Sequence, residues 1–339
     1  MFIVIEGTDA SGKSSLIEAV RQQLIERYPN EQLSEFHKGK PGEETRRWVL
    51  NDYVTSIEKR NWLRSVGLSD RWHWGEVTYA PKYRPHTNND GYGLLGKAGW
   101  RWVELFLMSR GVAQFWLYQP LEVIQARLEA RGDEFVKTDD LQEILAQYIT
   151  ASNVSVLSDI LKPDSDSVEQ IPALATYIID VAGQVEECAR HLELFPYYIG
   201  NPKPKVLLVG DTRNITKRYG EETTLPFMPV DGNSAEYLLT SLPDDLWRDC
   251  GIVNINDPDV KLSFNALWNQ LGFPKIVVLG RLAEKTLASI PVAEDYYTVL
   301  PHPQYVRRFF NKTKEEYGQA IARVANGETK GKEETWTLR

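Results

Sequence analysis

The stretch GTDASGKSS, residues 7–15, combines the residue types that bind nucleotide phosphates. Gly7 and Gly12 frame four residues and are followed by Lys13 and Ser14, which is the complete spacing of a P-loop. Backbone N–H groups of such a loop face the phosphate oxygens, the lysine adds positive charge, and the serine hydroxyl ligates Mg²⁺. The sequence therefore predicts a site for ATP and Mg²⁺. The expected ATP-binding residues are Gly7, Thr8, Asp9, Ala10, Ser11, Gly12, Lys13, Ser14 and Ser15.

Asp9 adds a carboxylate inside this loop, where a side chain projects towards the phosphate acceptor. It can take a proton from an acceptor hydroxyl there, or hold a sugar hydroxyl. The alternative is that Asp9 only shapes the turn. The first interpretation favours a kinase over a GTPase or a motor, which a P-loop alone does not distinguish.

The elements around the loop are those that the P-loop pattern requires. An apolar run at residues 2–6 predicts a buried strand, and residues 14–26 carry apolar residues at helical spacing. Short strands that alternate with helices predict an α/β fold with a parallel sheet and flanking helices. The further elements expected in this part are strands at 65–69 and 114–118 and helices at 121–131, 141–160 and 169–193.

The length of 339 residues favours two domains. The segment FPYYIGNPKPK (195–205) contains three prolines and a glycine, which is typical of a linker. A second α/β unit follows, with strands expected at 206–210, 251–254 and 275–280 and a helix at 282–290. The expected organisation is a P-loop kinase domain at 1–200, a second α/β domain at 201–325 and a polar tail at 326–339.

Charge and composition exclude several classes of protein. The net charge is −8, and residues 1–200 carry 21 Lys and Arg against 29 Asp and Glu, whereas residues 201–339 carry 18 of each. This balance disfavours strong non-specific nucleic-acid binding and leaves only a local groove for it. Cys188 and Cys250 are far apart, so we expect a reduced protein without structural zinc. We also expect no membrane span and no secretory signal, and therefore a cytoplasmic location.

Several segments within residues 1–150 resemble thymidylate kinases in their order along the chain. FIVIEGTDASGKSSL (2–16) resembles the opening of that family, with its acidic residue inside the loop. KPGEETRRWVL (40–50) falls at the Pro-Gly acceptor segment, in altered form, and LSDRWHWGE (68–76) resembles the Asp-Arg-aromatic motif. FWLYQPLEVIQARLEARGDEF (115–135) resembles the strand, helix and arginine-bearing lid, and DDLQEILAQYI (139–149) the helix after the lid.

The resemblance implies roles for individual residues. Asp70 would lie at a strand end near Mg²⁺, and Arg71 would grip the acceptor or its phosphate. Arg127 and Arg131 would be lid arginines that stabilise charge on the transferring phosphoryl group, or else charges on a solvated helix face. The expected catalytic residues are Asp9, Lys13, Arg71, Arg127 and Arg131, and the expected metal ligands are Ser14 and Asp70.

The acceptor side departs from the family pattern. Residues 72–76, Trp-His-Trp-Gly-Glu, are bulkier than usual, and an insertion at 79–100 is rich in turn residues. Seven of the ten tryptophans lie within residues 48–116, where they either form a core or offer a stacking surface for bases. His73 is either a packed histidine or a base. The expected acceptor-binding residues are Arg71, Trp72, Trp74 and Glu76.

Residues 204–318 resemble the uracil-DNA glycosylase superfamily. The similar segments are VLLVGDTRN (206–214), LPFMPVDGNSAEYLL (225–239), IVNIND (252–257), PKIVVLGRLAEKTL (274–287) and LPHPQYVRRF (300–309). In that family a base is extruded from DNA, stacked on an aromatic residue and recognised by an asparagine. The candidates for base or DNA contact are Asp211, Phe227, Asn254, His302 and Arg307. Because the loop at Asp211 departs from the family pattern, the domain either cleaves with Asp211 as a substitute or only binds.

A kinase joined to a base-extruding fold favours an acceptor within DNA. Phage enzymes that phosphorylate 5-hydroxymethyluracil in DNA are P-loop kinases of this broad kind, so the resemblance implies this activity, in the host cytoplasm if the chain is encoded by a bacteriophage. One alternative is a kinase of free dTMP or 5-hydroxymethyl-dUMP, whose second domain is a passenger or a dimerisation unit. Another is a DNA-binding or repair protein with a regulatory P-loop. The expected partners are therefore a nucleotide and DNA, with a homodimer left open.

Overall fold

The computed structural model describes residues 1–39, 45–58, 65–85, 90–132, 138–162, 170–212, 225–229, 232–291, 296–309 and 314–328. The chain divides into two compact units, unit 1 with residues 1–96 and 111–188 and unit 2 with residues 97–110 and 189–339. The units differ from the expected ranges 1–200 and 201–325 in two ways. The main boundary lies after Cys188, and residues 97–110 belong to unit 2 although unit 1 precedes and follows them.

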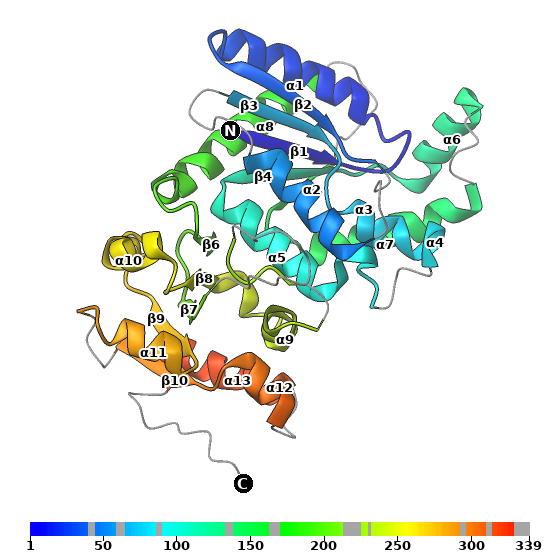
Figure 1. Ribbon diagram of the computed structural model, residues 1–339. Helices are drawn as coiled ribbons and strands as arrows, with labels where there is room; N and C mark the ends of the chain where they lie inside the picture. The colour runs from blue at the N-terminus through cyan, green and yellow to red at the C-terminus, as the bar shows by residue number, and fades with distance from the viewer. Residues whose placement is uncertain are drawn as a thin grey trace. The chain divides into compact units, whose positions relative to one another are not determined.

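Unit 1 contains a five-stranded parallel sheet (Figure 1). Its strands are β1 (Phe2–Glu6), β2 (Gln32–His37), β3 (Ser65–Asp70), β4 (Val112–Leu117) and β5 (Ser158–Leu161), in the order β2-β3-β1-β4-β5. The register places Ile5 of β1 beside Asp70 of β3. The carboxyl ends of these strands therefore meet at one edge of the sheet, where the P-loop follows β1.

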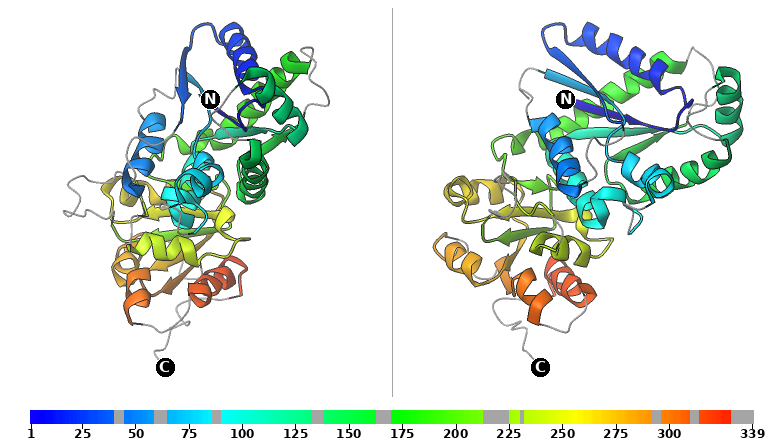
Figure 2. Two further views of the ribbon diagram at one scale, coloured as in Figure 1. Left: turned by 90° about the vertical axis from the view of Figure 1, so that its right-hand side faces the viewer. Right: turned by 45° about the vertical axis from the view of Figure 1, so that its right-hand side comes forward.

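One face of this sheet is covered by α1 (Lys13–Arg27) and α8 (Gln170–Ala189), which contribute to one apolar cluster with the strands. The two helices lie next to each other in both views of Figure 2 (blue and green). Gln23 Nε2 donates to Pro172 O over 2.9 Å, and Arg27 pairs with Asp180 at 2.5 Å. Burial of this face fixes α1 directly behind the P-loop.

The opposite face of the sheet carries aromatic side chains. Trp116 of β4 stacks on Tyr148 at 5.9 Å between ring centroids, and Phe2 of β1 meets Trp72 edge-on at 5.3 Å. These contacts attach α7, which contains Tyr148, and the segment after β3. The helices of unit 1 besides α1 and α8 are α2 (Arg46–Glu58), α3 (Gly75–Thr78), α4 (Ala80–Tyr83), α6 (Leu121–Arg131) and α7 (Thr138–Val154).

The expected helix at 141–160 is wrong at its end, because α7 stops at Val154 and residues 158–161 form β5. Ser155 explains the change: its hydroxyl accepts a hydrogen bond from Leu157 N–H at 3.2 Å. A serine side chain that binds the backbone two residues on favours a turn over a helix. Pairing with β4 then takes up the backbone groups of β5.

Unit 2 contains a second five-stranded sheet, in the order β10-β9-β7-β8-β6. Its strands are β6 (Ile199–Gly200), β7 (Val206–Gly210), β8 (Cys250–Asn254), β9 (Lys275–Leu279) and β10 (Tyr297–Leu300). The pairings are parallel except for β6, which runs antiparallel to β8. The segment expected as a linker, 195–205, thus contributes an edge strand to this sheet.

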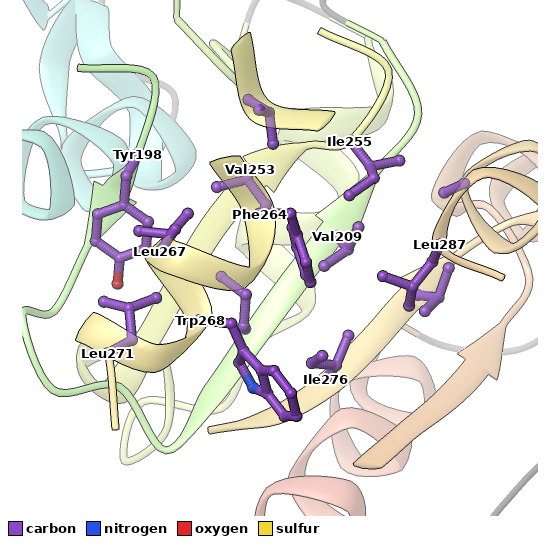
Figure 3. Close-up of a cluster of buried hydrophobic side chains, with 14 of the residues drawn as sticks. Tyr198, Val209, Val253, Ile255, Phe264, Leu267, Trp268, Leu271, Ile276 and Leu287 are labelled. Carbon is purple, nitrogen blue, oxygen red and sulfur yellow. The ribbon is translucent and has the colours of Figure 1, made fainter. Parts of the chain in front are cut away.

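The apolar cluster in Figure 3 connects β7, β8 and β9 to α10 (Pro258–Gln270) through fully buried side chains such as Val209, Phe264 and Leu267. The other helices of unit 2 are α5 (Gly96–Ser109), α9 (Ser234–Ser241), α11 (Arg281–Leu287), α12 (Pro303–Phe309) and α13 (Lys314–Ala325). The tail expected at 326–339 lies outside the described residues from 329 onward.

Helix α5 belongs to unit 2 through specific contacts. Arg101 is buried, and its Nη1 donates to the carbonyl oxygens of Leu239 and Leu242, each at 2.6 Å. Trp102 Nε1 donates to Pro226 O over 3.0 Å. Carbonyl groups at the end of α9 have no partner within their own helix, so Arg101 supplies the donors they need.

No helix among the described residues combines the length and the apolar character needed to cross a membrane.

Candidate active site

The turn between β1 and α1 has the geometry of a phosphate-binding loop. Gly12 immediately precedes α1 with a φ of 95°, a left-handed conformation that costs glycine little. A Cβ on Gly7 would lie 2.9 Å from Ser11 Oγ and 3.0 Å from Leu117 O. Both positions therefore require glycine, one for its backbone angle and the other for space.

Lys13 lies almost entirely buried at the first position of α1. Its Nζ donates to Thr8 O over 2.7 Å, so the ammonium group is folded against the loop. Burial, reinforced by the positive charge of Arg71, lowers the pKa of Lys13 to about 8. A phosphate group would offset both effects, because it replaces the lost hydration and neutralises the charge.

Two side chains from other elements fix the loop. Tyr148 OH donates to Gly7 O over 3.0 Å from α7, and Arg127 Nη1 donates to Ala10 O over 3.0 Å from α6. The structure therefore places Arg127 on the P-loop backbone. Arg131, at the end of α6, instead lines the pocket of the loop. Residues 133–135, the end of the segment that resembles the lid, lie outside the described residues.

This donor pocket has a volume of about 130 Å³. Its lining residues are Asp9, Ala10, Ser11, Gly12, Lys13, Ser14, Ser15, His37, Asp70, Arg71 and Arg131. Asp70 Oδ2 lies 3.1 Å from His37 Nδ1, whereas Asp70 Oδ1 is buried without a hydrogen-bond partner among the described residues. Because Mg²⁺ prefers oxygen ligands, Asp70 and the Ser14 hydroxyl fit this ion.

A second pocket of about 330 Å³ lies beside the donor pocket and shares Asp9 and Arg71 with it. We call it the acceptor pocket. Its lining residues are Asp9, Lys38, Gly39, Tyr53, Arg71, Trp72, Gly75, Glu76, Tyr79, Tyr83 and Arg84. The segment 40–44, which carries the expected Pro-Gly motif, lies outside the described residues.

Asp9 and Arg71 form an ion pair at the boundary between the two pockets. The second contact of Arg71 Nη2 is Tyr79 OH at 3.3 Å, and its guanidinium lies 5.1 Å from the centre of the Tyr79 ring. The Asp9 carboxylate and the Arg71 guanidinium therefore lie where the two pockets meet.

The other two cations among the described residues of the acceptor pocket are also paired with carboxylates. Lys38 Nζ contacts Asp52 at 2.6 Å, and Arg84 Nη2 contacts Glu76 at 2.8 Å. Glu76 Oε2 also accepts from Leu94 N–H at 3.0 Å, so this buried carboxylate is held on both oxygens. These cations are balanced within the protein before any substrate binds.

The expected acceptor residues separate into two groups. Trp72 and Glu76 line the acceptor pocket, and Lys38 Nζ lies 5.0 Å from the Trp72 ring. Trp74 is instead buried in the core between Trp116 and Tyr148 and does not line the pocket. His73 is also buried.

Sequence reasoning missed Lys38, Tyr53, Tyr79, Tyr83 and Arg84 in this pocket. Tyr79 and Tyr83 stand four residues apart, and their rings stack at 6.4 Å. That spacing was a usable signal, because it puts both phenols on one side of a helical turn. Lys38 and Tyr53 carried no such signal, since they come from elements that only the tertiary fold brings together.

The candidates in unit 2 gather at the carboxyl edge of its sheet. Asp211 follows β7, Asn254 ends β8, and His302 follows β10. A Cβ on Gly210 would collide with the Phe227 ring and lie 2.8 Å from Asn254 Oδ1, so these two side chains flank Gly210. A Cβ on Gly280 would lie 3.0 Å from the Cβ of His302.

Further polar residues of unit 2 join this cluster. Asn256 Nδ2 donates to Asp211 Oδ1, and Thr286 Oγ1 donates to Asn256 Oδ1. Burial lowers the pKa of His302, while the Asp211 carboxylate acts in the opposite direction. Arg307 lies nearby in sequence on α12, where its Nη1 donates to Gly232 O. Sequence reasoning did not identify Asn256 or Thr286.

No protein-family model matches the chain. The curated SPbeta prophage-derived uncharacterized protein YorR of Bacillus subtilis (strain 168) is 25% identical over 146 residues, which are 43% of this chain and 78% of YorR. A thymidylate kinase of Chlamydia felis (strain Fe/C-56) is 43% identical over 58 residues, 17% of this chain and 28% of that enzyme.

Two solved structures match about half of the chain. The crystal structure of YorR from Bacillus subtilis in complex with phosphorylated GDP has 19% identity, covers 54% of this chain and 98% of its own, and gives a TM-score of 0.42. Deoxyadenosine kinase from M. mycoides with dCMP and dCDP has 13% identity, 53% and 100% coverage and a TM-score of 0.32.

Over the matched residues, the N-terminal part of the chain is thus similar in sequence to YorR and to a thymidylate kinase. These matches bring no support for the expected likeness of the C-terminal part to uracil-DNA glycosylases, which stays a prediction.

Proposed function

We propose that the chain transfers the γ-phosphate of ATP to the 5-hydroxymethyl group of 5-hydroxymethyluracil in DNA. The observation that carries the proposal is the Asp9–Arg71 ion pair, which lines both the donor pocket and the acceptor pocket. A P-loop that only switched or stored a nucleotide would need no second pocket at the same carboxylate.

The chemistry follows from the positions of these groups. The acceptor oxygen attacks the γ-phosphorus, the bond from that phosphorus to the ADP oxygen breaks, and Asp9 takes the hydroxyl proton. Lys13 and Arg71 lie at the pocket to stabilise the negative charge that spreads over the phosphoryl oxygens. Mg²⁺, held by Ser14 and Asp70, would neutralise charge on the phosphates.

The charge balance of the acceptor pocket favours an uncharged acceptor. Each cation among its described lining residues is engaged by a carboxylate, so a substrate phosphate would have to compete with that carboxylate for the cation. The walls supply Tyr53, Trp72 and Tyr79, flat groups suited to a base. A volume of about 330 Å³ falls at the lower end of ligand pockets, which suits a base with its sugar.

The DNA part of the proposal rests on unit 2, which we propose to be a glycosylase-like domain that handles the base or its strand. Beyond the cluster around Asp211 and Asn254, α12 exposes an aromatic pair, Tyr305 and Phe309, with ring centroids 5.0 Å apart. Arg308 is exposed on the same helix. Aromatic rings next to arginines are suited to bases and phosphates of nucleic acid.

A kinase of free dTMP or 5-hydroxymethyl-dUMP is the second candidate. The 43% identity over 58 residues to a thymidylate kinase favours it, as does the excess of acid in residues 1–200, which repels DNA.

A phosphate-transfer assay with γ-labelled ATP and Mg²⁺, in which both kinds of acceptor are offered, decides between the two candidate functions. Duplex DNA with 5-hydroxymethyluracil is offered beside dTMP and 5-hydroxymethyl-dUMP, with thymine DNA of the same sequence as the control. We expect label in the modified DNA, and none with Lys13→Ala or Asp9→Asn. Label only in free nucleotides would establish the second candidate. DNA binding by both the wild type and Lys13→Ala, with no phosphate transfer by the wild type to any acceptor, would instead indicate a binding or repair protein.

A further inference from the structure

Arg71 adopts a backbone conformation that its residue type disfavours. Its φ is 65°, in the left-handed region, where the Cβ of a residue other than glycine is crowded by the backbone. The N–H of Arg71 donates to Ile5 O over 2.9 Å, so the turn is attached to the end of β1. Such a conformation persists only where the surroundings enforce it.

Two buried side chains form hydrogen bonds with the peptide group between Arg71 and Trp72. Ser69 Oγ donates to Arg71 O over 2.8 Å, and Glu6 Oε1 accepts from Trp72 N–H at 2.7 Å. The carbonyl of Arg71 and the N–H of Trp72 belong to one peptide group, so Ser69 and Glu6 hold its two ends. Together with the bond to Ile5 O, these contacts fix both backbone angles of Arg71.

Glu6 does not line the donor pocket or the acceptor pocket. It is fully buried on β1, and its Oε2 has no hydrogen-bond partner among the described residues. Burial raises the pKa of this carboxyl group. Electrostatic interactions with His73 and Arg71 and the hydrogen bond from Trp72 N–H act against this effect of burial.

We propose that Glu6 and Ser69 are positioning residues that hold the Arg71–Trp72 peptide so that the Arg71 guanidinium meets Asp9 between the two pockets. They act only through Arg71 and touch neither substrate. The kinetic readout rests on the proposed phosphotransferase function, but the geometry of Arg71 does not.

Matched variants separate this role from general stability. Glu6→Leu removes the acceptor, whereas Glu6→Gln keeps an amide oxygen that can take the Trp72 N–H. We expect kcat to fall about 100-fold in Glu6→Leu and to return within about threefold of wild type in Glu6→Gln. The Kd of a non-hydrolysable ATP analogue should agree within about twofold between the two variants, because both remove the same carboxylate charge near Lys13. Ser69→Ala and Ser69→Thr form the second pair, with the same expected order.

Gln114 provides the control for buried polar groups on this sheet. It lies on β4 beside Val4 of β1, on the same face as Glu6, and is equally buried. Gln114→Leu should leave kcat unchanged. In an Arg71→Met background, Glu6→Leu should lower kcat no further, since a residue that acts through Arg71 loses its effect with it.

Crystal structures give a readout that needs no activity. We expect Glu6→Leu to lose the left-handed φ of Arg71 or its contact with Asp9, and Glu6→Gln to keep both. A Glu6→Leu structure that keeps both, or an equal loss of kcat in the Arg71→Met background, would overturn the proposal. If the wild type phosphorylates neither acceptor, the proposed function fails, and these structures still decide the role of Glu6 and Ser69.

Discussion

Lys13 and Gln114 are both buried polar residues of unit 1, but they differ in their hydrogen bonds. The Lys13 ammonium is buried, and among the described residues it has one hydrogen-bond acceptor, Thr8 O, an arrangement that favours binding of an anion. Gln114 is buried on β4, and neither its Nε2 nor its Oε1 has a hydrogen-bond partner among the described residues. Burial of Lys13 lowers stability but prepares the site for an anion. Burial of Gln114 lowers stability without a compensating hydrogen bond among the described residues.

The affinity for ATP should fall as pH rises through about 8. The pKa of Lys13 in the free protein is lowered to about 8, and phosphates favour its charged form. Below pH 8 the lysine is charged before binding; above pH 8 it must take up a proton, which weakens binding by up to about tenfold per pH unit. Titration of a fluorescent ATP analogue from pH 6.5 to 9.5 measures this. Lys13→Arg, which stays charged, should remove the slope; an equal slope in that variant would refute the assignment.

Gln114→Leu should stabilise the protein by about 1 kcal/mol, because it removes two unsatisfied buried polar atoms at nearly constant volume. Urea unfolding should show a higher midpoint with an unchanged m-value. A lower midpoint would mean that Gln114 makes a hydrogen bond that this account omits.

Helices α8 and α13 each contain a glycine, and the space around the two glycines differs. Gly318 of α13 packs so closely on α9 that a Cβ would collide with Ser241 O, whereas no atom lies within 4 Å of a Cβ on Gly183 of α8. Glycine is therefore required for the contact between α13 and α9, and only weakens α8.

The two alanine substitutions should have opposite effects on stability. Gly318→Ala should destabilise unit 2 by about 3 kcal/mol, because backbone must move, and Gly183→Ala should stabilise unit 1 by about 0.5–1 kcal/mol through helix propensity. Thermal unfolding of both variants beside wild type checks this. Two shifts of the same sign would contradict the packing described for α13.

At the scale of helices and strands, elements that follow from a local sequence pattern could be predicted, whereas contacts between segments far apart in the sequence could not. The strand at 2–6, the P-loop and the helix after it follow from one contiguous pattern, so they were predicted within one residue at each end. The helix expected at 141–160 failed because apolar spacing continued past the turn at Ser155 into β5. The acceptor pocket depends on β2, α2 and the segment after β3 meeting in space, which no local pattern contains.

At the scale of the whole molecule, the chain passes from unit 1 into unit 2, returns to unit 1 and then enters unit 2 again. Residues 97–110 form most of α5 and belong to unit 2. The residues before them, up to Gly96, and β4, which follows them, belong to unit 1. Sequence reasoning did not identify α5, in which nearly every residue is buried. The expected boundary at 200/201 therefore missed this exchange.

A chain truncated after Cys188 should fail to fold cooperatively. It would keep α5 but lack the carbonyl partners of Arg101 at Leu239 and Leu242 and the partner of Trp102 at Pro226. The truncated chain would expose Trp102 and the other apolar side chains of α5, which favours aggregation. Size-exclusion chromatography and near-UV circular dichroism test this against the full chain. A monomeric, cooperatively unfolding truncation would contradict the assignment of α5 to unit 2.

The central claim is that phosphate passes between the two pockets at Asp9 and Arg71 onto a base in DNA. The most direct measurement is mass spectrometry of nucleosides released from 5-hydroxymethyluracil DNA after incubation with ATP and Mg²⁺, for the wild type and for Asp9→Asn. The account predicts phosphorylated 5-hydroxymethyldeoxyuridine with the wild type and a loss of about 100-fold or more in Asp9→Asn. DNA that stays unmodified, or equal product from Asp9→Asn, would contradict it.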